Sequence, residues 1–131
     1  MASSAATALM FQGTAEEAMN FYVSLFPNSE ITEVEKYGPN EPGPEGSIKV
    51  ASFKIAGLHL LCMDSPVKHN FTFTPSISIF INCVDETELS AAYNQLLNGG
   101  QALMPLDNYG FSKKFGWVSD RFGVSWQLNL P

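Results

Sequence analysis

The side chains best suited to bind a metal ion lie in or just after one short segment. The segment "LHLLCMD" contains His59, Cys62 and Asp64, and His69 follows it. Imidazole, thiolate and carboxylate groups are the usual protein ligands of zinc and related cations. If the segment is a strand, His59 and Cys62 point to opposite faces, and His69 lies in a separate loop. We therefore predict no metal cluster here, and we interpret His59 as a partly exposed strand histidine.

The candidates for nucleophilic or acid catalysis are also few. Ser76 and Ser78 alternate in "SISIFINCV", so a strand would place both on its inward face. The sequence places no histidine beside them and contains no nucleophile-elbow pattern. Tyr109, in the loop "DNYGFSKKFG", could act as an acid or a hydrogen-bond donor, although aromatic loop residues most often simply pack. We expect the two serines to form hydrogen bonds.

Composition excludes several classes of partner. Seven basic and thirteen acidic residues among 131 give a net charge of −6, the wrong sign for neutralising nucleic-acid phosphates. No apolar run approaches the ~20 residues needed to cross a bilayer, and "MASSAATALMF" lacks the features of a secretory signal. We expect a cytoplasmic protein with no membrane partner. Cys62 and Cys83 show no metal-type spacing and are predicted to be buried free thiols.

The elements that must position these residues follow one order, which occurs twice. In the first copy, "TALMF" predicts a strand, and Thr14 with Glu17 forms a capping-box pattern at the start of a helix. The helical spacing continues through Leu25 and Phe26 until Pro27-Asn28 ends it. The strand "EITEVEKYG" and the proline- and glycine-rich loop 38–46 follow. "SIKVASFKI" and "LHLLCM" then flank Gly57 and predict a hairpin.

The second copy repeats this order with clearer signals. "SISIFINCV", residues 76–84, alternates strictly and predicts a strand. Asp85 followed by Glu88 indicates a helix start, and Asn98-Gly99-Gly100 indicates its end. "QALMPL" predicts the next strand, and "KKFGWVSDRFGVSWQL" predicts a hairpin that turns at Gly123.

Each copy therefore has the order strand, helix and three strands. Neither copy can cover its own apolar face, so we predict a single α+β domain over residues 1–131, with modules at 5–64 and 73–131. Two curved sheets would leave a central concavity, which is the natural place for a ligand.

Four segments carry a resemblance to a known family. These are "TAEEAMNFYVSLFPNSEI", "PSISIFINC", "GGQALMPLDNYGF" and "KKFGWVSDRFGVSWQLNL". They closely resemble the PhnB-like group, often labelled 3-demethylubiquinone 3-methyltransferase-like, of the vicinal oxygen chelate superfamily. That superfamily includes glyoxalase I, extradiol dioxygenases and bleomycin-resistance proteins. The resemblance implies the paired βαβββ fold that these proteins share, and it spans residues 7–130.

The resemblance also indicates where a metal would bind. Metalloenzymes of the superfamily use His, Glu or similar side chains on the first and last strands of each module. The matching positions here are Thr7, Leu61, Ser76 and Gln127. Only Gln127 is a plausible ligand, and a divalent cation needs several oxygen or nitrogen donors. We therefore predict no metal and no cofactor.

Methyl transfer, which the group label implies, is not supported by the residues. A nucleoside cofactor usually binds at a glycine-rich turn between a strand and a helix. The corresponding turns here are "QGTAEE" and "NCVDETE", and neither is glycine-rich.

Two hypotheses remain, and we favour the first. It is a metal-independent protein that binds an unknown small molecule, without evidence of catalysis. The alternative is a glyoxalase- or dioxygenase-type enzyme with an atypical metal site. A mostly apolar pocket with a few polar groups suits the first hypothesis. The predicted ligand-binding residues are Thr7, Leu61, Ser76, Ser78, Phe80, Tyr109, Trp117 and Gln127.

The aromatic content bears on self-association. Ten Phe, four Tyr and two Trp are more than one small core obviously needs. Aromatic residues are enriched in interfaces as well as in cores, and the resembling superfamily commonly pairs modules across chains. We therefore expect a two-fold homodimer.

Overall fold

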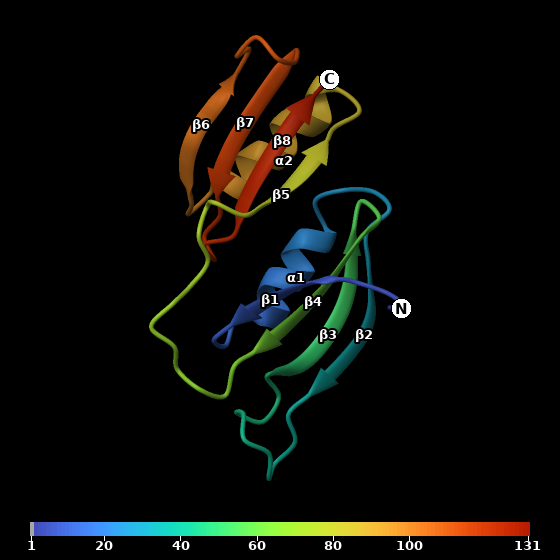
Figure 1. Ribbon diagram of the computed structural model, residues 1–131, viewed down its shortest axis with the longest axis vertical. Coiled ribbons are helices and arrows are strands. Elements are labelled where there is room, and N and C mark those ends of the chain that lie inside the picture. Colours follow the sequence, from blue (N-terminus) through green and yellow to red (C-terminus); the bar gives the residue numbers. More distant parts are fainter. Residues whose placement is uncertain (1) are drawn as a thin grey trace. The chain divides into compact units, whose positions relative to one another are not determined.

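The computed structural model describes residues 2–131, and the chain forms two compact units. The first runs to His69 and the second from Asn70 to Pro131. Each unit has the predicted order of one strand, one helix and three strands (Figure 1). The predicted α+β class and the βαβββ repeat are therefore confirmed. That the units share one core around a concavity stays a prediction.

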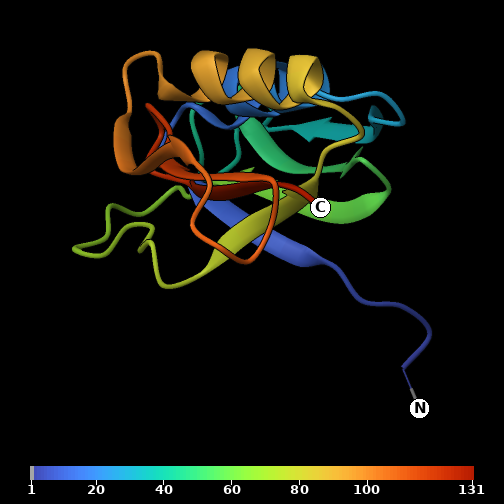
Figure 2. The same ribbon diagram turned by 90° about the horizontal axis from the view of Figure 1, so that it is seen from above.

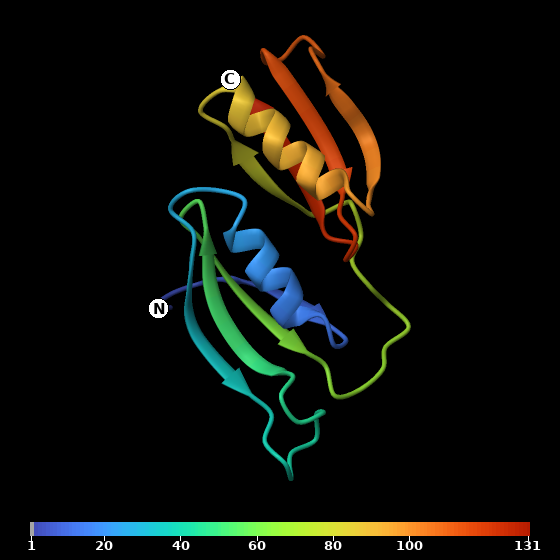
Figure 3. The same ribbon diagram turned by 180° about the vertical axis from the view of Figure 1, so that it is seen from behind.

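The first unit is a four-stranded sheet with one helix on one face (Figure 3). Its strand order is β1-β4-β3-β2, in which β1 and β4 are parallel and the other pairs are antiparallel. The edge strand β2 carries mostly exposed side chains, including three glutamates, and charged edges of this kind discourage pairing with another chain. The elements are β1 (Thr7–Phe11), α1 (Ala15–Val23), β2 (Glu30–Lys36), β3 (Ile48–Ile55) and β4 (Leu58–Asp64).

The second unit repeats this arrangement. Its sheet has the order β5-β8-β7-β6, with β5 and β8 parallel. Figure 2 shows α2 lying along one face of this sheet. The elements are β5 (Ser78–Asn82), α2 (Glu86–Leu97), β6 (Gln101–Asp107), β7 (Lys114–Ser119) and β8 (Ser125–Leu130).

Strand alternation separates the two faces of the second sheet. Residues of one parity pack under α2, and those of the other parity lie on the face that the helix does not cover. The covered face supplies the core, together with Leu89, Ala92 and Leu96 of the helix. Its buried side chains from the sheet are Ile79, Ile81, Val118, Trp126 and Leu128.

The two helices begin in different ways. Asp85 caps α2 as predicted, because its carboxylate accepts the Glu88 backbone N–H at 2.8 Å. Thr14 is the N-cap residue of α1 as predicted, but the Thr14 side chain forms no cap hydrogen bond, so that part of the predicted capping box was wrong. Instead Asp64, at the end of β4, accepts the backbone N–H groups of Gly13 at 2.8 Å and Ala15 at 3.0 Å. A partner 49 residues from Ala15 cannot be found from local spacing.

Element boundaries differ from the prediction at two places. The strand predicted over residues 76–84 is shorter, because Ser76 lies in a turn and Ile77 is 66% exposed. Ser76 contacts Thr74 there, hydroxyl to hydroxyl at 3.3 Å. Helix α1 ends at Val23, before Leu25 and Phe26, although Phe26 is still buried. The alternation of polar and apolar residues begins before the start of β5, and the helical spacing continues past the end of α1. The sequence pattern therefore did not indicate either boundary.

The loop 38–46 folds back on the ring of Tyr37. A Cβ at Gly43 would lie 2.3 Å from that ring, so only glycine permits the contact. The Tyr37 hydroxyl donates to the backbone oxygen of Asp64 at 3.2 Å. Within residues 2–131, no helix is long and apolar enough to cross a membrane.

The β7–β8 turn generates a test of backbone strain. Gly123 has φ +90°, and an added Cβ would meet Phe73 only at ordinary contact distance, so any cost comes from the backbone. We expect Gly123→Val to lower the free energy of unfolding by about 1–3 kcal/mol. Gly123→Asn should cost clearly less, because Asn tolerates positive φ. Urea denaturation measures both, and equal stability of the Val variant and the wild type would contradict this expectation.

Candidate functional site

The helix-free face of the second sheet holds the largest group of predicted site residues. Strands β5 and β8 pair in parallel, which places Phe80 opposite Gln127. Strand β7 pairs antiparallel with β8 and places Trp117 opposite Gln127. Directly paired residues project to the same face of a sheet. Three of the residues predicted from the sequence therefore lie side by side.

Hydrogen bonds join the polar side chains on this face. Ser125 is 1% exposed, and its hydroxyl lies 2.6 Å from that of Ser78. Trp117 donates its Nε1–H to the Ser125 hydroxyl at 2.8 Å. Gln127 donates its amide N–H to the Ser78 hydroxyl at 3.2 Å. This hydrogen-bonded group, the serine network, is uncharged and fixes the orientation of the Trp117 ring.

Four aromatic rings form a cluster beside the serine network. Phe115 is buried at the centre, with ring centroids at 5.0 Å from Phe111, 6.3 Å from Tyr109 and 6.3 Å from Phe80. The three outer rings stay 39–63% exposed. We call Phe80, Tyr109, Phe111 and Phe115 the ring cluster. Its outer rings offer apolar surface to a ligand.

The role considered for Tyr109 as an acid receives no support from its contacts. Its hydroxyl donates to the backbone oxygen of Pro105. A phenol held in this way anchors its own loop to the end of β6. In the structure Tyr109 contributes its ring to the cluster.

One buried acceptor on this face has no donor. The amide of Asn129 donates to the Asn82 side-chain oxygen at 3.0 Å. Its own Oδ1 is buried and has no hydrogen-bond partner among the described residues. Register places Asn129 opposite Phe115, next to the ring cluster. The oxygen is closed off from solvent, so it offers no contact to a molecule on the surface of this face.

The remaining predicted residues lie elsewhere. Ser76 sits in the exposed turn before β5, outside the sheet. Thr7 and Leu61 belong to the first unit, where Thr7 pairs with Leu60 and Leu61 pairs with Ala8. Thr7 therefore does not share a face with Leu61. Only Ser78, Phe80, Trp117 and Gln127 come together, with Tyr109 joined to them through the ring cluster.

The register also tests the metal positions that the resemblance implied. Leu61 and Gln127 each lie four residues after a hairpin glycine, and their neighbours on the first strands are Ala8 and Phe80. Three of these four side chains are apolar. By this register, the match of Thr7 and Ser76 to the first-strand positions was wrong, because the strand register cannot be read from the turns alone. Among residues 2–131, no three His, Cys, Asp or Glu side chains form a group that could hold a metal ion. The residues present do not fit a divalent cation.

The potential ligands near β4 are dispersed, as predicted. His59 is exposed, whereas Cys62 and Asp64 are buried on the helix-covered face. The carboxylate of Asp64 accepts a third backbone N–H from Ile48 at 2.9 Å, so its role is structural. His69 contacts the Ser65 hydroxyl at 3.0 Å, in the segment after β4.

The two cysteines are buried free thiols, as predicted. Burial raises the pKa of Cys62 to about 12, with a smaller contribution from the Asp64 carboxylate. Burial likewise raises the pKa of Cys83 to about 12, with Glu88 and Asp85 adding to it. The thiolate is the nucleophile, so neither cysteine is suited to attack at neutral pH.

The turns that enter the helices do not fit a nucleoside cofactor. Such a cofactor needs free backbone donors at a strand-to-helix turn. At α1 the donors of Gly13 and Ala15 are already bound to Asp64. At α2 the Glu88 backbone N–H is bound to Asp85, and its side chain accepts from the Val84 backbone N–H at 3.1 Å. Carboxylates of the chain itself occupy both turns.

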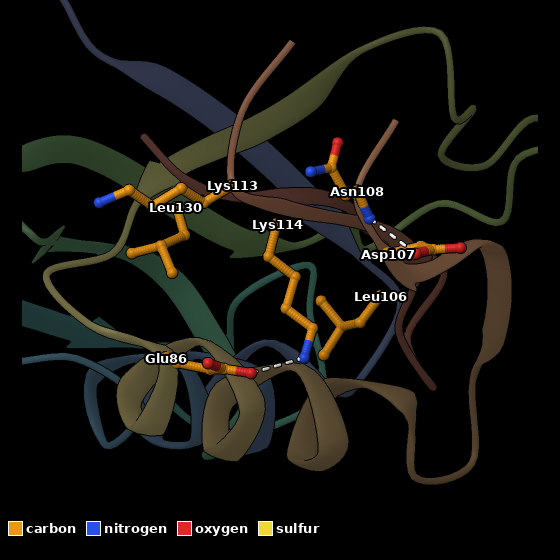
Figure 4. A pocket seen from close by; sticks show the side chains of 7 residues that line it. All are labelled: Glu86, Leu106, Asp107, Asn108, Lys113, Lys114 and Leu130. Atoms are coloured by element: carbon orange, nitrogen blue, oxygen red, sulfur yellow. Dashed lines mark hydrogen bonds and ion pairs between the residues drawn. The ribbon is translucent and has the colours of Figure 1, made fainter. Parts of the chain in front are cut away.

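A hollow of about 460 Å³ lies at the start of α2 (Figure 4). Its central charges are already paired, because the Lys114 ammonium lies 2.8 Å from the Glu86 carboxylate. Lys113 and Asp107 extend toward opposite sides (Figure 4), so their charges do not converge on a ligand. We therefore do not place the functional site in this hollow.

Sequence reasoning missed several members of the site. Ser125 and Asn129 lie two residues before and after Gln127, so the alternation of β8 could have indicated both. Phe115 lies two residues before Trp117 and follows the same rule. The ring of Phe111 comes from a loop, and no periodic signal indicated its position.

Comparison with known proteins finds a family model that matches most of the chain. A family model described as 3-demethylubiquinone-9 3-methyltransferase matches residues 3–129. The uncharacterized protein Rv0887c of Mycobacterium tuberculosis is 26% identical over 126 residues, which cover 89% of this chain and 68% of that protein.

Solved structures show the same fold. A PhnB protein from Bacillus cereus, provisionally assigned as a 3-demethylubiquinone-9 3-methyltransferase, is 50% identical with a TM-score of 0.95, over 98% of this chain and 100% of that chain. The fosfomycin resistance protein FosX from Mesorhizobium loti is 10% identical with a TM-score of 0.65, over 100% of this chain and 94% of that chain. This second likeness shows the fold alone.

The serine network generates a second prediction. Ser125→Ala leaves the Trp117 Nε1–H without its acceptor, and we expect a loss of about 1–3 kcal/mol in the free energy of unfolding. Hydrogen exchange of the Trp117 indole should become faster. Ser76→Ala, in the exposed turn, is the control and should change stability by less than about 0.5 kcal/mol. Unchanged protection of the Trp117 indole in Ser125→Ala would show that the network does not hold the ring.

Proposed function

The chain belongs to the 3-demethylubiquinone-9 3-methyltransferase family, and we propose that it is a metal-independent, small-molecule binding member of that family. The resemblance to PhnB-like proteins is thereby confirmed, and the likeness to FosX shows that the fold is shared. The proposed site is the helix-free face of the second sheet. The observation that carries the proposal is the serine network beside the exposed rings.

The chemistry of this face suits binding better than catalysis. Ser78 and Ser125 bond to each other, and no described histidine lies on the second unit to activate them. A face of apolar rings with a few ordered polar groups matches the general composition of small-molecule sites. The polar groups are held in place before a ligand arrives, which lowers the ordering cost of binding.

Metal analysis distinguishes a metal-independent binding protein from a metalloenzyme. We expect protein purified without chelators or nickel resin to contain metal far below one equivalent, because Ala8, Leu61 and Phe80 supply no ligand atoms. Gln127→Glu should fold normally and still bind no metal tightly. One equivalent of tightly bound metal in the unmodified protein would overturn the proposal.

A thermal-shift screen tests the binding role directly. We propose screening small metabolites and amphipathic drugs, since a ligand at 100 times its Kd should stabilise the protein by about 2.7 kcal/mol. The hits should lose most of this stabilisation in Phe111→Ala. If no compound stabilises the protein, or every hit is insensitive to changes on this face, the proposed site is wrong.

We also propose that the chain forms a two-fold homodimer. Large apolar side chains remain exposed at Val67, Ile77 and Val84, with exposed fractions of 60–80%. A self-complementary contact would cover such residues and end the assembly at two copies. Light scattering at micromolar concentration should give about twice the 14.3 kDa monomer mass. A mass equal to that of the monomer would reject the dimer.

A further inference from the structure

We propose that the ligand of this face is an organic carboxylate with an apolar body, in which Lys113 binds the carboxylate and the ring cluster binds the body. The inference rests on the proposed function and specifies its ligand class. It follows from three properties of the second unit: the position of Lys113 beside the ring cluster, the absence of a partner for its charge within the chain, and the placement of the acidic side chains around it.

Lys113 lies in the segment of chain that builds the ring cluster. The chain bends at Lys113, and the rings of Phe111 and Phe115 on either side of it meet at a centroid distance of 5.0 Å. The Lys113 backbone N–H donates to the Leu130 backbone oxygen at 3.0 Å, which fixes this bend to β8. In Figure 4 Lys114 extends to Glu86 on α2, whereas Lys113 does not turn toward that helix. The long flexible side chain of Lys113 can therefore reach a molecule that covers the rings.

The charge of Lys113 has no partner in the described part of the chain. Lysines elsewhere form ion pairs with glutamates, and these are Lys36, Lys49, Lys54 and Lys114. Within residues 2–131, Lys113 forms no ion pair and no side-chain hydrogen bond, and it is exposed. Most cations of this acidic chain are thus neutralised internally, and Lys113 can bind an anion from solution without breaking an existing pair.

The acidic side chains around the ring cluster do not neutralise Lys113. Asp107 lies opposite Phe115 in the register of β6 and β7, but it extends toward the other side from Lys113 (Figure 4). Its carboxylate accepts the Asn108 backbone N–H at 2.8 Å. Glu86 is held by Lys114 at 2.8 Å. The cluster therefore has a positive side and a negative side, and a single carboxylate on the ligand would be attracted to Lys113 and repelled by Asp107.

The rings must supply most of the affinity. An exposed ion pair contributes little because both charges are well hydrated, so a small anion such as acetate would gain little from Lys113 alone. Phe80 and Phe111 are 51% and 63% exposed, and covering them removes apolar surface from water. The apolar body therefore provides the binding energy, and Lys113 selects the charge of the group attached to it.

Four probes test the ligand class. They are 2-naphthoate, which has the body and the anion; 2-naphthamide, which is neutral; 2-naphthylmethylammonium, which is cationic; and acetate, which lacks the body. Binding is followed in two-dimensional NMR by the indole N–H signal of Trp117. The indole N–H of Trp126 is the internal reference, because that residue is fully buried and its N–H is bound to Asp120 at 2.9 Å.

We expect 2-naphthoate to bind about threefold more tightly than 2-naphthamide, since one exposed ion pair corresponds to roughly this ratio. The cationic probe should bind more weakly than the amide, acetate should give no shift, and high salt should reduce the preference for the anion. The net charge of −6 by itself would favour the cation, so a preference for the anion requires a local positive charge.

Variants of Lys113 assign the preference to this residue. Lys113→Gln should remove the preference for 2-naphthoate and leave the affinity for 2-naphthamide unchanged, whereas Lys113→Arg should retain it. Lys68→Gln is the matched control and should also retain it. Lys68 belongs to the first unit, is exposed and has no ion pair among residues 2–131, so its loss changes the net charge equally.

The outcomes distinguish this inference from the proposed function. Equal affinity for 2-naphthoate and 2-naphthamide, or a preference that survives Lys113→Gln, would overturn the ligand class while leaving a binding site on this face. Loss of the preference in Lys68→Gln, or failure of every probe to shift Trp117 at millimolar concentration, would also overturn it. The proposed function itself fails on different results, which are stoichiometric metal or a thermal-shift screen without hits sensitive to Phe111→Ala.

Discussion

The candidate site depends on the parallel pairing of the first and last strands of the second module. This pairing joins Ser78 to Gln127, 49 residues apart in the sequence. Parallel strands need a long crossover connection, and here the helix and two further strands supply it. The helix that makes the crossover covers one face of the sheet, so the polar side chains gather on the other. The first module has the same pairing between β1 and β4, but Leu61 and Ala8 stand where the second module has Gln127 and Phe80.

The hydrogen bonds that stabilise the two helix starts also limit what the chain can bind there. Helix N-termini are natural anion sites, yet Asp64 and Asp85 occupy those of α1 and α2. These carboxylates stabilise the helix starts and remove the donors that a phosphate or a nucleoside would need. The family description names methyl transfer. The residues at these two turns do not provide a conventional site for its cofactor.

The helix-free face of the second sheet has hydrogen-bonded polar side chains next to exposed apolar rings. Its serine network is internally bonded and uncharged, whereas the adjoining rings are partly exposed. Removing apolar surface from water is favourable, and burial of aromatic area provides most of the binding energy in sites of this kind. These properties support the proposed binding role better than acid–base or metal chemistry.

The sequence by itself determined the module order, the turn at Gly123, the cap at Asp85 and the separation of His59 from Cys62. These features depend on local spacing, alternation and turn chemistry, which neighbouring residues specify. It also indicated Ser78, Phe80, Trp117 and Gln127, and it placed the start of the first helix correctly at Thr14. It wrongly extended the strand to Ser76 and assigned a capping hydrogen bond to the Thr14 side chain. Only the tertiary structure decided that Asp64 binds the start of the first helix and that Ser125 joins Trp117 to Ser78. Each of these contacts depends on strand register or chain crossover, because residues distant in the sequence become neighbours only when the sheets form.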